Sequence, residues 1–230
     1  MVIKHLDYDE PVLRYHAILA DLVADLAGPD EAVIDIGCGP GQILSQIAAR
    51  RPDLRLVGVD GDAECLRRAA DRCPTATFVE GNIQRLDEVE LPLDGFPLIV
   101  SSHALEHVPD PVGALQSWQR RLGPGGRLVI AVPNSLQPLL LARALARRPK
   151  ANEGHYYIWD RATFENFCQL AGFRIVDRAV DYVPLAPVRV RERLPVIARA
   201  ERTLLGPLPQ FSNSHIVVLE PTDAVVPAGG

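Results

Sequence analysis

The sequence predicts an α/β fold built on a mainly parallel sheet, and three observations support this prediction. Residues 33–36 form a short apolar run that is typical of a central strand covered on both faces. A loop with glycine at every second position follows this run, and apolar residues at helical spacing follow the loop. The succession of strand and helix then repeats along the chain, which is typical of parallel sheets.

Each further element is expected from its own local pattern. Residues 10–27 carry an apolar stripe at helical spacing that a Gly-Pro pair ends, and this helix is expected over the mouth of a ligand site. Asp110 is the expected N-cap of a helix at 111–122, with Pro111 in its first turn. The other predicted elements are strands at 56–59, 128–132, 173–180 and 216–219 and helices from residue 43 and at 62–73.

The glycine loop predicts a ligand site. Gly37, Gly39 and Gly41 allow a tight turn and let a ligand approach the backbone without interference from a Cβ atom. The helix that follows offers backbone N–H groups and a partial positive charge at its N-terminus. Such loops suit dinucleotides, phosphates and S-adenosylmethionine. Asp35 precedes the loop and would repel a pyrophosphate but attract an ammonium group, which favours a ligand that carries one.

A second acidic residue fits a ribose. The predicted strand 56–59 ends in Asp60, which lies roughly 20 residues past the last loop glycine. An acid at this point can accept hydrogen bonds from both hydroxyl groups of a ribose.

With these residues the chain resembles the class I S-adenosylmethionine-dependent methyltransferases, from about residue 33 to residue 220. Residues 35–41 read Asp-Ile-Gly-Cys-Gly-Pro-Gly and are similar to the first motif of that family, and Asp60 is similar to its ribose-binding acid. Residues 80–83 and 122–127 resemble two later motifs. The segment 101–107, Ser-Ser-His-Ala-Leu-Glu-His, is similar to that of the quinone-biosynthesis-like subgroup of small-molecule methyltransferases.

The resemblance implies a Rossmann-like, seven-stranded and mostly parallel sheet with an antiparallel last strand, helices on both faces and a small cap made by insertions. It also implies S-adenosylmethionine as the cofactor. Asn82 stands where the family usually has an acid beside the adenine, so its amide oxygen would have to accept that hydrogen bond. His103 would contact the methionine portion through its backbone. The residues expected to bind the cofactor are Asp35, Gly37, Cys38, Gly39, Gly41, Asp60, Gly61, Asn82, Ile83, Ser101 and His103.

Length and composition agree with one compact domain. The chain has 230 residues, of which 47% are hydrophobic, enough to build one α/β core. We expect an N-terminal helical segment at 1–30, a cofactor-binding core at 31–133 and substrate-cap insertions at 134–159 and 182–212. The arginines of the second insertion suggest either a solvated face, an anionic-substrate clamp or transient attachment to a membrane surface.

Charge and cysteine content exclude several classes of protein. The net charge of −5 and the pI of about 5.7 argue against a nucleic-acid partner. The four cysteines show no paired spacing, so neither disulfides nor zinc are indicated, no metal is assigned, and a cytoplasmic location is expected. No run is long and apolar enough for stable membrane insertion. A small-molecule acceptor is the expected partner, and a homodimer is left open.

The expected reaction is in-line displacement at the cofactor methyl group, for which alignment of the acceptor provides much of the acceleration. A base is needed only if the acceptor must lose a proton. The candidates are His107, for which a structural role is the alternative, and His155 in the first insertion. Glu106 lies closer to the sheet end and is not assigned, and Tyr15 and His16 of the first helix are also left unassigned.

The acceptor class and two alternatives remain open. Residues 101–104 lack the Asn-Pro-Pro-Tyr or Asp-Pro-Pro-Tyr sequence that methylation of DNA bases or protein glutamines would require. There is no clustered set of carboxylates with aligned histidines that would suggest a catechol-type magnesium site. A small hydroxyl, carbon or amine acceptor remains, with oxygen favoured. The alternatives are a non-catalytic binding protein of methyltransferase fold and an NAD-dependent oxidoreductase.

Overall fold

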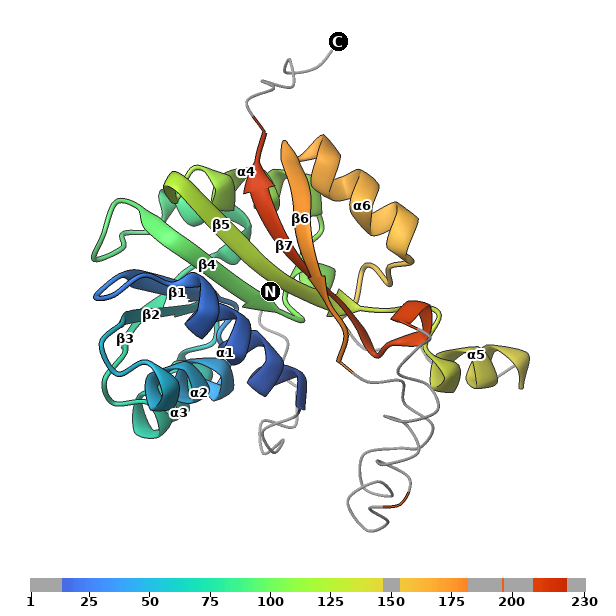
Figure 1. Ribbon diagram of the computed structural model, residues 1–230, viewed down its shortest axis with the longest axis horizontal. Helices are drawn as coiled ribbons and strands as arrows, with labels where there is room; N and C mark the ends of the chain where they lie inside the picture. The colour runs from blue at the N-terminus through green and yellow to red at the C-terminus, as the bar shows by residue number, and fades with distance from the viewer. Residues whose placement is uncertain (1–13, 147–153, 182–195, 197–208, 223–230) are drawn as a thin grey trace.

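The computed structural model describes residues 14–146, 154–181, 196 and 209–222 (Figure 1). Its centre is a seven-stranded sheet with the strand order β3-β2-β1-β4-β5-β7-β6. The strands are β1 (Ala32–Ile36), β2 (Arg55–Asp60), β3 (Thr77–Glu80), β4 (Phe96–Ser102), β5 (Leu122–Pro133), β6 (Phe173–Ala179) and β7 (Ser214–Pro221). The α-helices are α1 (Arg14–Leu26), α2 (Gln42–Arg50), α3 (Ala63–Arg72), α4 (Pro111–Gln119), α5 (Pro138–Leu145) and α6 (Arg161–Leu170).

The strands confirm the predicted mostly parallel sheet with an antiparallel last strand. β1 pairs in parallel with β2 on one side and with β4 on the other, and β3 and β5 extend the parallel set. β7, the last strand in the chain, runs antiparallel between β5 and β6. Of the seven strands described, β7 is therefore the one that runs opposite to the others. The loops after β1 to β4 all leave from one edge of the sheet (Figure 1).

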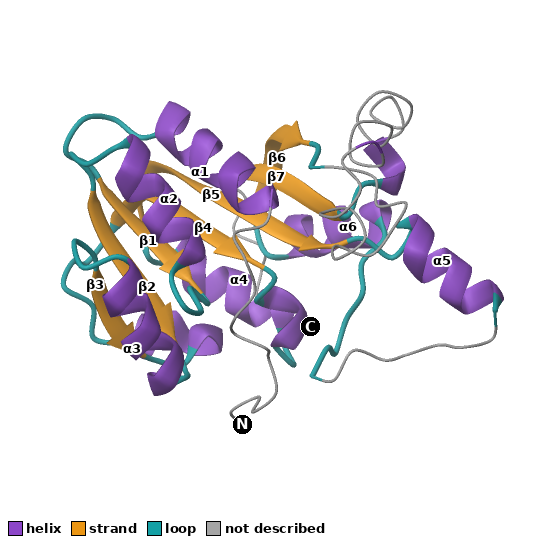
Figure 2. Cartoon of the chain, turned by 90° about the horizontal axis from the view of Figure 1, so that it is seen from below, coloured by secondary structure: helices purple, strands orange, loops and turns teal. Residues whose placement is uncertain are grey.

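Helices cover both faces of the sheet, with a separate apolar core on each (Figures 1 and 2). Successive side chains of a strand point to opposite faces. In β1, Val33 therefore belongs to the same core as Leu19 of α1, whereas Ile34 belongs to the core that contains Trp118 of α4 and Phe164 of α6. Because both faces are buried, β1 reads as a continuous apolar run interrupted only by Asp35.

Most predicted boundaries agree with the observed ones to within a few residues, and the start of β5 is the clearest difference. The motif at 122–127 was expected to be a turn before the strand, but β5 begins at Leu122, which pairs with Phe96; the register then shifts, and regular pairing resumes at Arg127 opposite Leu98. The backbone N–H of Phe96 donates to the carbonyl of Arg121 at 2.9 Å, so the chain enters the sheet early. The helix expected to reach residue 122 consequently ends at Gln119.

The two expected insertions differ in how much of them is described. α5 extends away from the sheet (Figures 1 and 2), and the chain then returns to it, where the backbone N–H of Ser135 donates to the carbonyl of Trp159 at 2.8 Å. Most of the second expected insertion, 182–212, lies outside the described residues. Among the residues described, no helix has the length and apolar character that crossing a membrane requires.

Trp118 ties α4 to the 3₁₀-helix η1 (Ile83–Glu88), which follows β3. Its buried indole Nε1–H donates to the carbonyl of Ile83 at 2.6 Å. Trp159 is equally buried, but its Nε1 has no hydrogen-bond partner among the described residues. The two tryptophans are therefore equally buried, but of the two only Trp118 has a hydrogen-bond partner for its indole N–H among the described residues.

We predict that Trp118→Phe lowers the free energy of unfolding by about 1 to 3 kcal/mol more than Trp159→Phe does. The first substitution leaves the Ile83 carbonyl without its donor, whereas the second removes ring volume and an unpaired N–H group. Urea unfolding of both variants measures this difference. Equal losses would show that the indole hydrogen bond contributes nothing to stability.

Candidate functional site

A cavity of about 980 Å³ lies at the edge of the sheet where β1 to β4 end. The segments that follow these four strands line it, at residues 37–40, 42–43, 60–62, 80–84, 102–104 and 106–109. Tyr15 and His16 of α1 and residues 154–156 complete the wall. Ligands of parallel α/β sheets bind at this edge, and the volume suits a small molecule together with a cofactor.

The glycine loop forms the floor of the cavity. Gly37 has a φ of 72°, and a Cβ atom built there would lie 2.5 Å from the Cβ of Ala104. The N–H groups of Gly37 and Cys38 both donate to the carbonyl of Val59, at 2.8 and 3.0 Å, which holds the loop against the end of β2. Only glycine fits at position 37, as the loop pattern predicted.

The N-terminus of α2 opens toward the same cavity. Its N-cap is Gly41, which has no side chain to accept from the first N–H groups of the helix. Gln42 and Ile43, the first two helical residues, line the cavity. An uncapped helix N-terminus offers donors and a partial positive charge to a carboxylate or another anionic group.

Asp60 lies opposite this helix end. Its two carboxylate oxygens accept from the backbone N–H groups of Gly39 at 2.8 Å and Asp62 at 3.0 Å. Burial raises the pKa of Asp60, and these backbone hydrogen bonds oppose the shift. Each carboxylate oxygen retains a second lone pair, so Asp60 can still accept from hydroxyl groups in the cavity. Gly61 also lines the wall here.

Asp35 lies behind the cavity wall instead of in it. Its side chain is 1% exposed, and neither carboxylate oxygen has a hydrogen-bond partner among the described residues. Burial, followed by repulsion from Asp60, raises its pKa to about 8. Any effect of Asp35 on a cationic ligand must therefore act through the loop that covers it.

Two other predicted residues also stay behind the wall. The buried hydroxyl of Ser101 donates to the carbonyl of Ile36 at 2.8 Å, which links β4 to β1. Gly41 packs against Ala69 of α3, where a Cβ atom would lie 3.1 Å from that residue. Their positions support the loop without lining the cavity.

Asn82 and Ile83 line the cavity beyond β3. The amide oxygen of Asn82 accepts from the backbone N–H of Gln84 at 3.0 Å, so it caps the 3₁₀-helix η1. That oxygen keeps one lone pair for the adenine contact expected from the sequence. Glu80 lines the same part of the wall and was not singled out by sequence reasoning.

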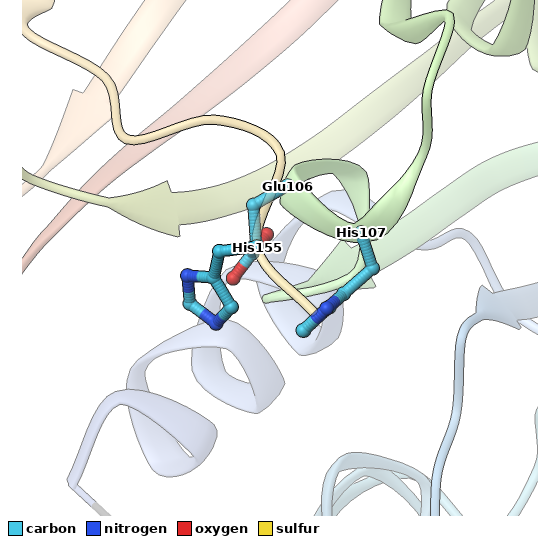
Figure 3. Close-up of side chains that lie close together, drawn as sticks. All are labelled: Glu106, His107 and His155. Atoms are coloured by element: carbon cyan, nitrogen blue, oxygen red, sulfur yellow. The ribbon is translucent and has the colours of Figure 1, made fainter. Parts of the chain in front are cut away.

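The far part of the cavity is lined by histidines and Glu106. Figure 3 shows Glu106, His107 and His155 close together, although His155 comes from a segment 48 residues away from His107. The rings of His107 and His155 meet edge-on with centroids 4.6 Å apart. His103, which has a left-handed φ of 50°, lies with its Nδ1 3.3 Å from Glu106 Oε1 and its Nε2 3.0 Å from Ser214 Oγ.

Three hydrogen bonds hold the segment that carries His155 against the turn after β4. His107 Nδ1 donates to the carbonyl of Gly154 at 2.9 Å, and the N–H of Tyr156 donates to the carbonyl of Glu106 at 2.8 Å. The hydroxyl of Tyr157 donates to the carbonyl of Pro109 at 2.9 Å. The structure therefore brings together the two predicted catalytic residues, His107 and His155.

Burial disfavours the protonated form of two imidazoles in the cavity, those of His155 and His16. It lowers the pKa of His155, and nearby His107 and His103 act in the same direction while Glu106 opposes them. It also lowers the pKa of His16 to about 4. Both rings are therefore neutral at neutral pH and present lone pairs instead of positive charge.

Sequence reasoning missed several residues of the wall. Glu106 was left unassigned, although it lies at the centre of the histidine group, and Tyr156 was named only as part of the insertion. Tyr15 and His16 reach the cavity from α1, where the Tyr15 ring packs 4.9 Å from that of His103. Their aromatic and polar character within the helical stripe was the signal available for them.

Comparison with known proteins places the chain among methyltransferases. A family model described as "Methyltransferase domain" matches residues 12–178. Trans-aconitate 2-methyltransferase of Afipia carboxidovorans is 33% identical over 120 residues, which are 51% of this chain and 45% of that protein. The same enzyme of Azoarcus sp. is 35% identical over 116 residues, 50% of this chain and 44% of that protein. The chain spans about half the length of these curated relatives.

Solved structures support the fold. The CcbJ methyltransferase of Streptomyces caelestis has a TM-score of 0.64 at 14% identity, covering 95% of this chain and 94% of that one. Magnesium protoporphyrin IX methyltransferase of Synechocystis, determined with bound S-adenosylhomocysteine, has a TM-score of 0.60 at 15% identity, covering 88% and 80%. At these identities the likeness establishes the shared fold.

We predict that the unliganded protein loses stability through Asp35 as the pH rises. The pKa of this carboxyl is about 8 in the folded chain and about 4 in an unfolded one. Below about pH 4 this carboxyl is neutral in both states and does not reduce the stability of the fold. As the pH rises from about 4 to about 8, the unfolded chain releases this proton more readily than the folded chain, so the free energy of unfolding falls. Asp35→Asn removes this dependence. The stability of the variant minus that of the original chain should therefore increase from pH 5 to pH 8.

Thermal unfolding across this pH range measures the effect. Asp53→Asn is the control, because ion pairing with Arg51 holds the pKa of the exposed Asp53 at about 2, well below the window. Its difference from the original chain should stay constant between pH 5 and pH 8. A pH-independent difference for Asp35→Asn as well would contradict the prediction.

Proposed function

We propose, from the premise that this chain belongs to the class I methyltransferase family, that it transfers the methyl group of S-adenosylmethionine to a small-molecule acceptor. When bound, this cofactor supplies an electrophilic methyl group on a sulfonium, whose carbon–sulfur bond breaks as the acceptor bonds to the methyl carbon. The protein's part is to align the acceptor with that bond and to exclude water. A hydroxyl oxygen is the proposed acceptor atom.

The observation that carries this proposal is one cavity with two chemically different halves. One half has the glycine loop, the uncapped N-terminus of α2 and Asp60, which suit an amino acid joined to a nucleoside. The other half has Glu106 with His107 and His155, and burial lowers the pKa of His155. Gly37 lets the loop of the first half pack directly against Ala104 after β4, since a Cβ atom there would lie 2.5 Å from the Cβ of Ala104.

We assign the cofactor to the predicted residues that line the first half. These are Gly37, Cys38, Gly39, Asp60, Gly61, Asn82 and Ile83, to which we add His103, which lies beside Glu106. Asp60 is assigned to the ribose hydroxyls and the N-terminus of α2 to the methionine carboxylate. Asp35, Gly41 and Ser101 are assigned a supporting part behind the loop, since they do not line the cavity.

We assign the acceptor's proton to the half that holds His107 and His155. The hydrogen bond from His107 Nδ1 to Gly154 leaves its Nε2 with a lone pair, and the lowered pKa of His155 leaves that ring neutral. Both can therefore interact with an acidic hydrogen of the acceptor. The names of several relatives add trans-aconitate, a small organic acid, to the acceptors worth testing.

The remaining partner and location proposals follow from the sequence. The acidic net charge supports a small molecule over a nucleic acid, and a homodimer remains a hypothesis. All four cysteines are buried thiols outside any disulfide, which supports the cytoplasm as the location.

Calorimetric titration with S-adenosylmethionine, S-adenosylhomocysteine and NAD tests the function. We expect binding of the first two in the micromolar range and no binding of NAD. Asp60→Asn should weaken binding at least tenfold, because the amide can accept fewer hydrogen bonds yet keeps the size of the side chain that holds the loop. Binding of NAD alone would favour an oxidoreductase, and binding of none would favour the non-catalytic alternative.

His155→Ala is predicted to lower methyl-transfer turnover at least tenfold while leaving S-adenosylmethionine affinity unchanged. The residue belongs to the acceptor half, and its removal leaves the glycine loop and Asp60 intact. Turnover is measured by S-adenosylhomocysteine release with a panel of hydroxyl and carboxylate acceptors. Unchanged turnover would show that alignment alone, or His107, accounts for the reaction.

A further inference from the structure

We propose that Glu106, His107 and His155 bind a divalent cation of the zinc type in the acceptor half of the cavity. One ligand atom from each residue lies within 4.8 Å of the other two (Figure 3). The three side chains line the same cavity as the predicted cofactor residues. The ion site can exist whether or not the chain is a methyltransferase, but a catalytic role for the ion rests on the proposed function.

The geometry needs only a small adjustment to hold an ion. Zinc–nitrogen and zinc–oxygen bonds of about 2.0 to 2.2 Å place tetrahedral ligands roughly 3.4 Å apart. The three atoms would therefore have to approach one another by up to about 1.5 Å. His155 is half-buried, and the hydrogen bonds of Gly154 and Tyr156 hold its segment, so we expect the approach to come from side-chain rotation and not from movement of the backbone.

Glu106 is the observation that points most directly to a cation. Its side chain is completely buried, yet neither carboxylate oxygen has a hydrogen bond from a described residue. His103 Nδ1 is 3.3 Å from Oε1, which is within ion-pair distance but lacks hydrogen-bond geometry. A buried carboxylate without hydrogen bonds is strongly disfavoured, and a bound cation would compensate for this.

The hydrogen bonding of the two histidines is compatible with metal binding. The bond from His107 Nδ1–H to the Gly154 carbonyl fixes the tautomer that has its lone pair on Nε2. His155 has a buried Nδ1 without a hydrogen-bond partner among the described residues. Metal-binding histidines commonly donate their second ring N–H to a backbone carbonyl in the manner of His107.

The donor set selects the kind of ion. Two imidazole nitrogens and one carboxylate oxygen match the three protein ligands of many catalytic zinc sites, which keep a fourth position open. Magnesium and calcium prefer sites made mainly of oxygen ligands. The sequence had indicated no zinc because the cysteine spacing was wrong, but this site uses no cysteine and joins residues 48 positions apart.

The open fourth position gives the ion a role in methyl transfer. An acceptor hydroxyl placed there loses its proton to water more readily, because the ion stabilises the negative oxygen. That oxygen's electron pair forms the new bond to the methyl carbon, and the pair of the broken carbon–sulfur bond stays on sulfur. His107 and His155 then act through the ion instead of taking the proton themselves.

The test uses the full chain after treatment with a chelator. Calorimetric titration with Zn²⁺ should give one site, and Co²⁺ should produce visible absorption bands that Zn²⁺ removes. Glu106→Gln and His155→Ala should each weaken Zn²⁺ affinity at least tenfold. Tyr156→Phe is the control, because Tyr156 lies next to His155 in the cavity but supplies none of the three ligand atoms.

Failure of the ion site can be told apart from failure of the proposed function. S-adenosylmethionine affinity is measured on the same chelator-treated protein, and circular dichroism shows whether each variant is folded. Cofactor binding without Zn²⁺ binding would overturn the ion site and leave the methyltransferase proposal standing. Unchanged Zn²⁺ affinity in folded His155→Ala or Glu106→Gln would also overturn it. Zn²⁺ binding without cofactor binding would support the site and overturn the function.

Discussion

The position of β1 between two parallel neighbours is the constraint on which the rest of this molecule depends. β1 is hydrogen-bonded to β2 on one side and β4 on the other, so the chain must leave all three strands at the same edge. The glycine loop, Asp60 and the turn that carries Glu106 therefore lie at the same edge of the sheet, although they are far apart in the sequence. Ser101 strengthens the arrangement, since its hydroxyl bonds to the carbonyl at the end of β1.

The half of the cavity that we propose for the cofactor could be predicted from the sequence because its signals are local. The glycine pattern between a predicted strand and a predicted helix is enough to predict the loop, and Asp60 is found at the end of the next strand. Residue spacing alone could not distinguish the motif residues that line the cavity from those that lie behind them. Asp35 belongs to the same motif as the glycines but points to the face of the sheet covered by α1 and α2. The alternation of side chains along β1 decides this.

The acceptor half depends on long-range contacts that no local pattern specifies. His107 and His155 were each recognised as candidates, but their ring contact and the buried carboxylate between their segments follow from how residues 154–157 return to the turn after β4. Glu106 carries no sequence signal of its own, because a glutamate in a turn is ordinarily exposed. The start of β5 was misjudged for a similar reason, since Leu122 pairs with Phe96 before the register shifts across the glycines and regular pairing resumes at Arg127.

The attachment of the His155 segment has an evolutionary consequence. All three hydrogen bonds that hold residues 154–157 end on main-chain carbonyl groups, of Gly154, Glu106 and Pro109. Carbonyl acceptors are present whatever the side chains at positions 106, 109 and 154, so those positions can change without loss of an acceptor. Two of the donors are the side chains of His107 and Tyr157, so substitution is constrained at these two positions if His155 is to keep its place.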